Sequence, residues 1–382
     1  MTGGLPLRFL HSSDWQIGKV FRHLPADRAA VLQEARLEAV SALGRLAQSE
    51  ACRFVLVAGD VYDLETPTER TLRAPLERMR AFPGIDWYLL PGNHDPARAG
   101  GLWERLMRAG LPENVHALTT PRTVAAADGL VSILPAPLVR KQSLQDPTEH
   151  FDALETPAGV PRIGLAHGAL RDFGEGRPTP NRIAADRALR AGLSYLALGD
   201  WHGWVAFDER SVYSGAPEPD AFGQENAGCC ALVTLRGEAP PLVERRPVGR
   251  FGWYERAERL TGPDDIERLE RLVRTLAPDP GCALLRLRVE GALSVPARAA
   301  WQERVVVAAG SALFHIEVED ALLSGEMTAD DLDTFGAGGV LRLTAERLQV
   351  MAAPGADPAQ AALARAALER LVLEYRLLGG GD

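Results

Sequence analysis

The 382-residue sequence contains few cysteines and no long apolar segment. Its four cysteines show no C-x-x-C spacing, and we expect them to be reduced, packed thiols of a cytoplasmic protein. The longest apolar stretch, Leu130 to Val139, is interrupted by prolines and falls short of the ~18 residues that a membrane-spanning helix needs. The start of the chain has no basic region followed by a hydrophobic segment, so no secretion signal is expected. These absences predict a cytoplasmic protein with no membrane partner.

The sequence also lacks an excess of positive charge. Its 42 lysine and arginine residues stand against 51 aspartates and glutamates, which gives a formal net charge of −9. A chain with this balance has no overall field that attracts nucleic acid, so phosphate binding must come from local features. A Walker-type glycine-rich loop is absent as well, and any dependence on ATP would therefore come from another chain.

The residues that are present predict a soluble globular protein of about two domains. Apolar residues make up 46% of the chain and charged residues 24%. Apolar strands alternate with amphipathic helices up to about residue 235, and the first two of these helices are expected at 27–48 and 66–81. This alternation predicts an α/β core. A segment rich in proline and charge, 236–247, is the expected boundary of this first domain, which we place at 1–240.

The rest of the chain predicts a smaller α+β domain at 241–352. Its expected elements alternate between helices and strands, at 264–276, 283–289, 296–309 and 314–318. A final helix lies within 353–382, because Asp357 and Pro358 form a helix start and Gly379 a stop. Its apolar stripe is either a docking face for a partner or a strap across the second domain. The stripe comprises Ala364, Leu368, Leu371, Val372, Tyr375 and Leu378.

Polar side chains follow five predicted strands, at the point where each strand ends. In chain order they are Asp14 and Gln16, Asp60, Asn93 and His94, His167, and Asp200 and His202. Open α/β sheets gather ligands at the carboxyl ends of their strands, so these side chains can converge. Carboxylates, an amide oxygen and imidazoles together suit two adjacent divalent metal ions, which clamp a phosphate and activate a water molecule. His94 is placed to stabilise the phosphate oxygens or to protonate the leaving group.

Each of these residues also has an ordinary structural role to weigh. Asp60 alone would more often cap a helix, and His167 alone would more often be a hydrogen-bonded core residue. Helix capping does not explain the run Asn93-His94-Asp95 or the ordered series of strand ends. We therefore favour the metal site.

Several residues near the strand ends are candidates for supporting roles. We expect Asp63 and Asp95 to orient neighbouring groups, and His11 to be structural. Lys19, Arg22 and His23 follow the first strand end, where they could contact DNA phosphates or equally form a solvated loop.

The motifs resemble those of a known superfamily. Gly59-Asp60, Gly92-Asn93-His94-Asp95, His167 and Gly199-x-x-His202 resemble the motif series of calcineurin-like metallophosphoesterases. Within that superfamily, two further segments resemble the SbcD-type DNA repair exonucleases. These are Ser-Ser-Asp14-Trp15-x-Ile-Gly18-Lys19, and Tyr213-Ser-Gly215-Ala-Pro-Glu218 followed by Phe222-Gly-Gln-Glu225. The resemblance covers residues 7–235, with an extra domain where that family carries a DNA-capping domain.

The resemblance implies a sandwich of two β-sheets flanked by helices, followed by a small α+β capping domain. It implies a first metal held by Asp14, position 16, Asp60 and His202, and a second held by Asp60, Asn93, His167 and position 200. The implied activity is that of a DNA exonuclease and endonuclease in DNA repair. Its implied partners are DNA and an SbcC-like coiled-coil ATPase, with a second copy of the chain as a further candidate.

The chain departs from the family pattern at two of these positions. Gln16 and Asp200 stand where the family usually has histidine. Both changes replace an imidazole nitrogen by oxygen, and oxygen ligands suit manganese and magnesium rather than zinc. We therefore expect two manganese ions, with magnesium as the other candidate. The alternatives are a phosphodiesterase or phosphatase that acts on a substrate other than DNA, and a catalytically weakened binding subunit in which Gln16 fails to hold the first metal.

Overall fold

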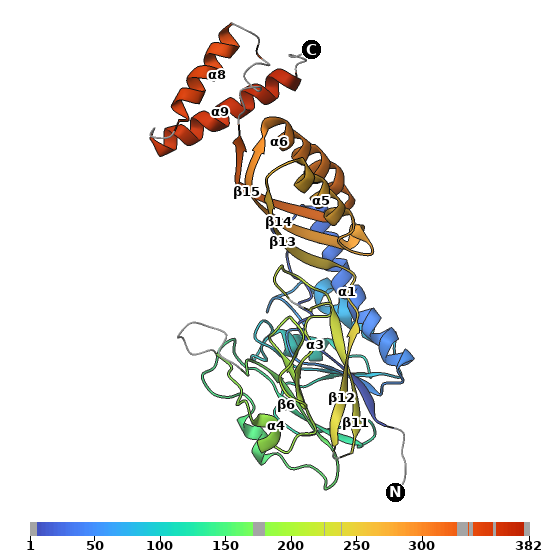
Figure 1. Ribbon diagram of the computed structural model, residues 1–382. Helices are drawn as coiled ribbons and strands as arrows, with labels where there is room; N and C mark the ends of the chain where they lie inside the picture. The colour runs from blue at the N-terminus through green and yellow to red at the C-terminus, as the bar shows by residue number, and fades with distance from the viewer. Residues whose placement is uncertain are drawn as a thin grey trace. The chain divides into compact units, whose positions relative to one another are not determined.

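The chain divides into two compact units, Met1–Phe251 and Gly252–Asp382. The computed structural model describes residues 6–170, 180–224, 226–237, 239–326, 335, 339–353 and 357–377 (Figure 1). Among these residues, no helix is both long enough and apolar enough to cross a bilayer.

The first unit is built from two six-stranded sheets (Figure 1). The first sheet contains, in spatial order, β12 (Ala239–Pro247), β11 (Cys229–Arg236), β1 (Arg8–Ser12), β2 (Phe54–Val57), β3 (Asp86–Leu89) and β4 (Val115–Ala117). The second contains β5 (Val124–Ala126), β6 (Val131–Ala136), β7 (Arg162–His167), β8 (Tyr195–Gly199), β10 (Ser211–Tyr213) and β9 (Val205–Ala206). Strands β1 to β4 run parallel to one another, as do β6, β7, β8 and β10.

Apolar side chains alternate between the two faces of each strand, and this alternation builds the layers. Phe9, Leu56 and Tyr195 belong to a core that both sheets share. Leu10 and Val57 belong to a second core, which three helices complete on the outer face of the first sheet. The helices are α1 (Ala26–Ser49), α2 (Glu69–Arg80) and α3 (Leu102–Ala109). The outer face of the second sheet is covered by the short helices η1 (Glu149–Ala153) and α4 (Arg187–Arg190). The expected sandwich of two sheets flanked by helices is confirmed.

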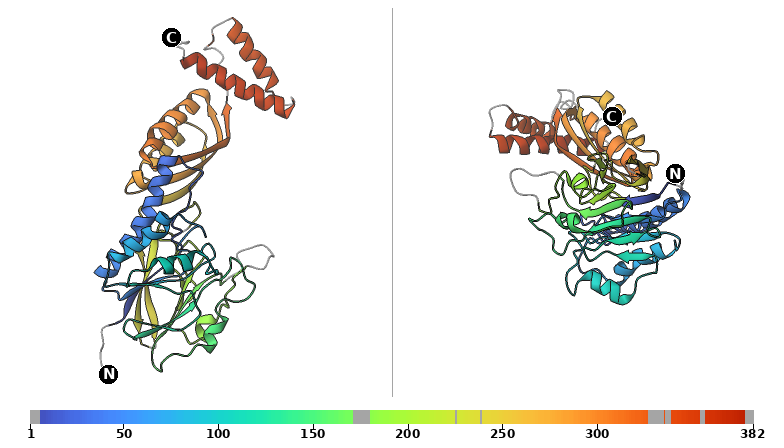
Figure 2. Two further views of the ribbon diagram at one scale, coloured as in Figure 1. Left: turned by 180° about the vertical axis from the view of Figure 1, so that it is seen from behind. Right: turned by 90° about the horizontal axis from the view of Figure 1, so that it is seen from below.

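The second unit contains a three-stranded, fully parallel sheet. Its strands are β13 (Gly252–Leu260), β14 (Ala283–Ser294) and β15 (His315–Glu326). Helices α5 (Pro263–Arg274) and α6 (Val295–Trp301) lie side by side against the sheet, as Figures 1 and 2 show from different directions. The connections of this unit also contain η2 (Pro280–Cys282), the π-helical η3 (Gln302–Ala309) and η4 (Gly310–Ala312).

Two helices, α8 (Val340–Met351) and α9 (Pro358–Leu377), pack against each other at the end of the chain (Figure 1). The carboxylate of Asp357 accepts hydrogen bonds from the backbone N–H groups of Ala359 and Gln360, which is the expected N-cap. Leu368 and Val372 of the apolar stripe pack with Ala345 of α8. Helix α8, which was not expected, therefore covers part of this stripe. Leu378 and Gly379 lie outside the described residues.

The boundary expected after residue 240 differs from the observed division, which follows Phe251. The supposed linker is strand β12, which pairs with β11 at the edge of the first sheet. An edge strand tolerates proline because some of its N–H groups have no partner strand to bond. Strand β13 was also missed from the sequence.

Candidate metal centre

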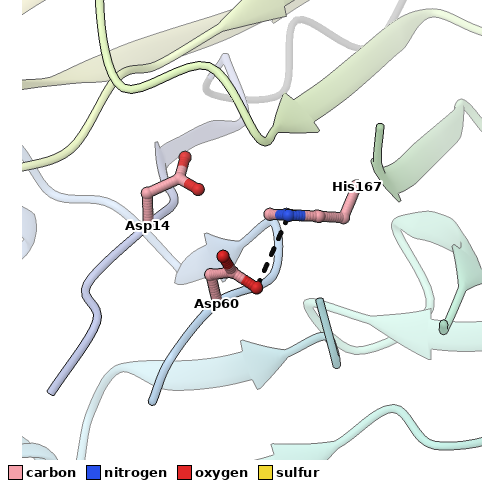
Figure 3. A group of neighbouring side chains, drawn as sticks. All are labelled: Asp14, Asp60 and His167. Atoms are coloured by element: carbon pink, nitrogen blue, oxygen red, sulfur yellow. Dashed lines mark ion pairs between the residues drawn. The ribbon is translucent and has the colours of Figure 1, made fainter. Parts of the chain in front are cut away.

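The loops that follow β1 and β2 and the end of β7 bring three ligand-type side chains together (Figure 3). One oxygen each of Asp14 and Asp60 and one nitrogen of His167 all lie within 4.8 Å of one another. All three residues are buried. Each belongs to a different segment of the sequence, and the parallel strands deliver them to the same edge of the sandwich.

Asn93 and Asp200 extend this group on the side of His167. The Nε2 atom of His167 lies 3.5 Å from Oδ1 of Asp60 and 3.5 Å from Oδ1 of Asp200. The Nδ1 atom of His167 lies 2.8 Å from the carbonyl oxygen of Ala58, to which it donates, so neutral His167 has its lone pair on Nε2. Asn93 donates from Nδ2 to Oδ1 of Asp200 at 2.8 Å. Together Asp60, Asn93, His167 and Asp200 line the expected second metal position.

His202 and Gln16 extend the group on the side of Asp14. The Nε2 atom of His202 lies 3.8 Å from Oδ1 of Asp14 and 3.2 Å from Nε2 of Gln16. The Nδ1 atom of His202 lies 3.1 Å from Oδ1 of Asp220. Lys19 donates to Oε1 of Gln16 at 3.2 Å. The structure therefore places Gln16 at the first position with its amide nitrogen, not its oxygen, facing His202.

The backbone of the site adopts conformations that residues other than glycine rarely adopt. Four candidate ligands have positive φ angles: Asp14 at 54°, Gln16 at 43°, Asp60 at 54° and Asp200 at 99°. Such strained non-glycine residues cluster at functional sites, where surrounding contacts hold them. The neighbouring Gly92 is required by space, because a Cβ atom there would lie 2.2 Å from Oδ1 of Asp60.

The charges of the site are unfavourable in the absence of a cation. Burial raises the pKa of the Asp14 carboxyl, although His202 and His167 act in the opposite direction. Burial lowers the pKa of His167, but the carboxylates of Asp60, Asp200 and Asp14 outweigh it and raise this pKa to about 9. The buried carboxylates favour a proton on the neighbouring imidazole. A bound cation in place of that proton would stabilise the carboxylates in the same way.

Two buried polar atoms test whether the residues suit a metal ion. Nε2 of His167 and Oδ1 of Asn93 have no hydrogen-bond partner among the described residues. An unsatisfied buried acceptor is costly, and a metal ion would satisfy both atoms. The donor set of carboxylate, amide and imidazole groups fits a divalent cation.

Arg36 and Asp220 belong to the site but were missed from the sequence. Arg36 donates to the backbone carbonyls of Trp15 at 2.8 Å and Asp14 at 3.3 Å, and it is buried. Asp220 is buried between His202, Lys19 and Arg36, whose charges keep the pKa of its carboxyl low despite its burial. The sequence offered one indication of a special role for Arg36, because this arginine occupies a position on the apolar face of α1.

Glu218 and Asp220 give the segment after β10 a defined structural role. The carboxylate of Glu218 accepts hydrogen bonds from the backbone N–H groups of Arg250 and Phe251, at 2.8 and 2.9 Å. Phe251 is the last residue of the first unit. The segment therefore holds both His202 and the end of the unit.

The residues expected to support the site have defined contacts. Asp95 is buried and accepts from the backbone N–H groups of Tyr62 and Gly92, at 3.0 and 2.7 Å, which ties two loops together. His94 lies 3.1 Å through Nδ1 from the carbonyl oxygen of Asp63. The side chain of His94 is 45% exposed, and its Nε2 atom lies 4.0 Å from Oδ2 of Asp60.

The remaining candidates near the first strand end differ in environment. Lys19 points inward to Asp220, at 2.7 Å, whereas Arg22 and His23 are exposed. A DNA contact of these three residues stays a prediction. His11 lies in the core, where its Nδ1 is 2.9 Å from the hydroxyl of Tyr195, as expected for a structural residue.

Two curated proteins are similar to this chain. The uncharacterized metallophosphoesterase YhaO of Bacillus subtilis (strain 168) is 29% identical over 216 residues, which cover 51% of this chain and 48% of the relative. The DNA double-strand break repair protein Mre11 of Haloferax volcanii is 24% identical over 305 residues, which cover 76% of this chain and 63% of the relative. The chain thus spans about half and about three fifths of the lengths of these relatives.

A solved structure and a family profile complete the comparison. The crystal structure of TT1561 of Thermus thermophilus matches 64% of this chain and 100% of its own, with a TM-score of 0.41 and 13% identity. The profile of the calcineurin-like phosphoesterases matches residues 7–234, more than half of the chain. This span contains every candidate metal ligand described above. The chain belongs to the calcineurin-like phosphoesterase family.

Proposed function

We propose that the chain is a metal-dependent DNA exonuclease and endonuclease of the SbcD type that acts in DNA repair. The observation that carries the proposal is the convergence of Asp14, Asp60 and His167 within 4.8 Å, at strand ends of a phosphoesterase fold. DNA as the substrate is supported by the similarity to a relative named as a DNA double-strand break repair protein. The second unit would serve as the DNA-capping domain.

Two divalent ions would be held by the residues at the two positions. Asp14, Asp60 and His202 would hold the first ion, with Gln16 as the remaining candidate, and Asp60, Asn93, His167 and Asp200 would hold the second. When bound, such ions polarise a phosphodiester and lower the pKa of a water molecule that attacks phosphorus. We propose manganese, with magnesium as the alternative, because Asp200 offers oxygen where the family usually offers imidazole.

The chain's own residues would position the substrate and supply a proton. In its imidazolium form, His94 would donate through Nδ1 to the carbonyl oxygen of Asp63 and would carry a second proton on Nε2, which can pass to the leaving oxygen of the phosphodiester. Trp201 lies between Asp200 and His202 in sequence and is 40% exposed. An exposed aromatic ring beside the candidate ligands can stack on a base of a frayed or single-stranded end.

The proposed partner is a coiled-coil ATPase of the SbcC type. Helix α8 exposes the apolar side chains of Val340, Leu343 and Val350. Exposed apolar side chains on an amphipathic helix are a docking surface for another helix. Replacement of Leu343 and Val350 by glutamate should abolish co-purification with the ATPase while leaving the nuclease domain folded. Undiminished co-purification of this double variant would contradict the docking site.

The activity is tested on substrates that separate the candidate functions. The full chain is incubated with manganese and, in parallel, with linear double-stranded DNA, a DNA hairpin and a bis-aryl phosphodiester. We expect cleavage of both DNA substrates, lost in Asp60→Asn, and weaker activity with zinc than with manganese. Hydrolysis of the small diester with intact DNA would instead indicate a phosphodiesterase with another substrate. Failure to cleave any substrate with any metal would indicate a binding subunit.

A further inference from the structure

We propose that Lys19 holds the side chain of Gln16 away from the first metal position, so that the two metal positions fill unequally. The second position, formed by Asp60, Asn93, His167 and Asp200, would bind its ion tightly, and the first would bind weakly. This inference rests on the proposed metal centre but not on DNA as the substrate.

The orientation of the Gln16 amide follows from the chemistry of Lys19. The ammonium group can only donate hydrogen bonds, so the Gln16 atom 3.2 Å from Nζ must be the carbonyl oxygen Oε1. The amide nitrogen of Gln16 then faces Nε2 of His202 at 3.2 Å. Gln16 therefore presents hydrogen atoms, not a lone pair, to the first position.

The same arrangement occupies the lone pair of His202. The amide nitrogen of Gln16 can only donate, so the lone pair of neutral His202 is on Nε2 and the proton is on Nδ1. Asp220 lies 3.1 Å from Nδ1 and accepts this proton, while Nε2 of Gln224 lies 2.8 Å from the same nitrogen. That lone pair accepts a hydrogen bond from Gln16. An ion at the first position must therefore break this bond before His202 can bind it.

Lys19 is itself fixed in place. Its Nζ atom lies 2.7 Å from Oδ2 of Asp220, and Asp220 is also held by Arg36 at 3.3 Å. The ammonium group adds a positive charge beside the first position, which opposes the arrival of a divalent cation. To coordinate an ion, Gln16 must give up its contact with Lys19 and turn its amide.

The second position presents the opposite situation. Nε2 of His167 and Oδ1 of Asn93 are buried and have no hydrogen-bond partner among the described residues. Once His167 is neutral, an ion at this position gains both acceptors without breaking a hydrogen bond to either atom. Because an ion at the first position must break hydrogen bonds that the second position does not have, the affinities of the two positions should differ by roughly tenfold or more.

Titration of the metal-free full chain with Mn²⁺ tests the proposal by calorimetry and electron paramagnetic resonance. We expect the first equivalent to bind at least about tenfold more tightly and to give the spectrum of an isolated ion. The second equivalent should convert it to that of an exchange-coupled pair. Asn93→Ala should weaken the first event, and His202→Ala should abolish the second.

Two variants address Lys19 and Gln16 directly. Lys19→Met should tighten the second event about tenfold and leave the first unchanged, because Asp220 keeps Arg36 and His202 as partners. Gln16→His should tighten the same event independently of Lys19. The matched control is Lys141→Met, which removes a lysine whose side chain is 58% exposed and paired with Glu65. This control should bind both equivalents as the natural protein does.

Two results would overturn the proposal. One is equal affinity for both equivalents in the natural protein. The other is a second event that Lys19→Met leaves unchanged although the variant is folded by circular dichroism, whatever the effect of Gln16→His. Failure to bind any manganese would overturn the metal centre itself, whereas loss of DNA cleavage with unequal manganese binding intact would contradict only the nuclease proposal.

Discussion

The guanidinium of Arg36 lies 3.3 Å from Oδ2 of Asp220, and both side chains are buried. The same guanidinium donates to the backbone carbonyls of Trp15 and Glu218, at 2.8 and 3.0 Å. One cation on α1 therefore fixes the loop after β1 and the loop after β10. The two loops carry Asp14 and the carboxylate that holds His202.

Arg36→Met should lower the free energy of unfolding by about 3–5 kcal/mol, because it leaves a buried carboxylate with fewer partners. Urea denaturation followed by circular dichroism measures this loss. The matched control is Arg45→Met on the same helix, where the exposed pair with Glu38 contributes at most about 1 kcal/mol. Equal losses in the two variants would show that the burial of Arg36 has no energetic consequence.

Addition and removal of metal should change stability through Asp60. Manganese at a hundred times its dissociation constant should raise the free energy of unfolding by about 2.7 kcal/mol, and a chelator should reverse the effect. Asp60→Asn should lose most of this stabilisation, because Asp60 lies at both metal positions. Asp27→Asn, on the exposed first turn of α1, is the control and should retain it. If manganese stabilises Asp60→Asn as much as it stabilises the natural protein, the metal does not bind at Asp60.

Metal binding should release a proton from His167. In the metal-free protein the pKa of His167 is raised to about 9, so this group is protonated at pH 7 and must lose its proton before Nε2 can bind metal. The apparent affinity should therefore rise about tenfold per pH unit from pH 7 to about pH 9 and then level off. Calorimetry in buffers of different ionisation enthalpy counts the released protons. His167→Asn should show no such release.

The same titration predicts how the stability of the metal-free protein changes with pH. The folded-state pKa of His167 lies above its ordinary value of 6.5, so protonation stabilises the folded protein. This contribution is fully present below pH 6.5 and is lost as the pH rises through about 9. Urea denaturation at pH 6.5 and pH 9 should therefore show a smaller loss of stability in His167→Asn than in the natural protein.

Trp201 should contribute to the binding of single-stranded DNA. Trp201→Ala should weaken binding of a labelled oligonucleotide about tenfold, since stacking on one base is worth about 1–3 kcal/mol. Trp201→Phe should restore most of the affinity, because phenylalanine keeps a flat ring. Fluorescence anisotropy in the presence of a chelator measures binding without cleavage. Unchanged affinity in Trp201→Ala would exclude stacking by this residue.

The sequence was sufficient to predict the sandwich and the convergence of the strand ends. Short strands such as β2 and β8 are buried on both faces, so their residues form continuous apolar runs. Such runs can be recognised in the sequence without knowledge of the tertiary structure. Asp60 and Asp200 follow the ends of these strands closely, and parallel pairing within each sheet together with the packing of the two sheets brings such residues to one edge.

Features that depend on neighbouring segments could not be predicted in the same way. Strand β12 contains three prolines and resembles a linker until its place at a sheet edge is known. Strand β13 is a largely exposed edge strand with several charged side chains. These charges hide the alternation of apolar and polar residues by which a strand is usually predicted. Asp220 lies on a loop, and only the fold shows that His202, Lys19 and Arg36 surround it.

The backbone is left-handed at Asp14, Gln16, Asp60 and Asp200, and at these positions the residue best for the backbone differs from the residue needed for function. Glycine adopts these φ values without a steric cost, so it is the residue that the backbone alone would favour at each position. Glycine has no side chain with which to bind an ion. A laboratory selection for heat resistance alone, in the absence of metal, would therefore favour glycine at positions 16 and 200, whereas Asp14 and Asp60 also accept hydrogen bonds from the backbone N–H groups of Asp200 and His94.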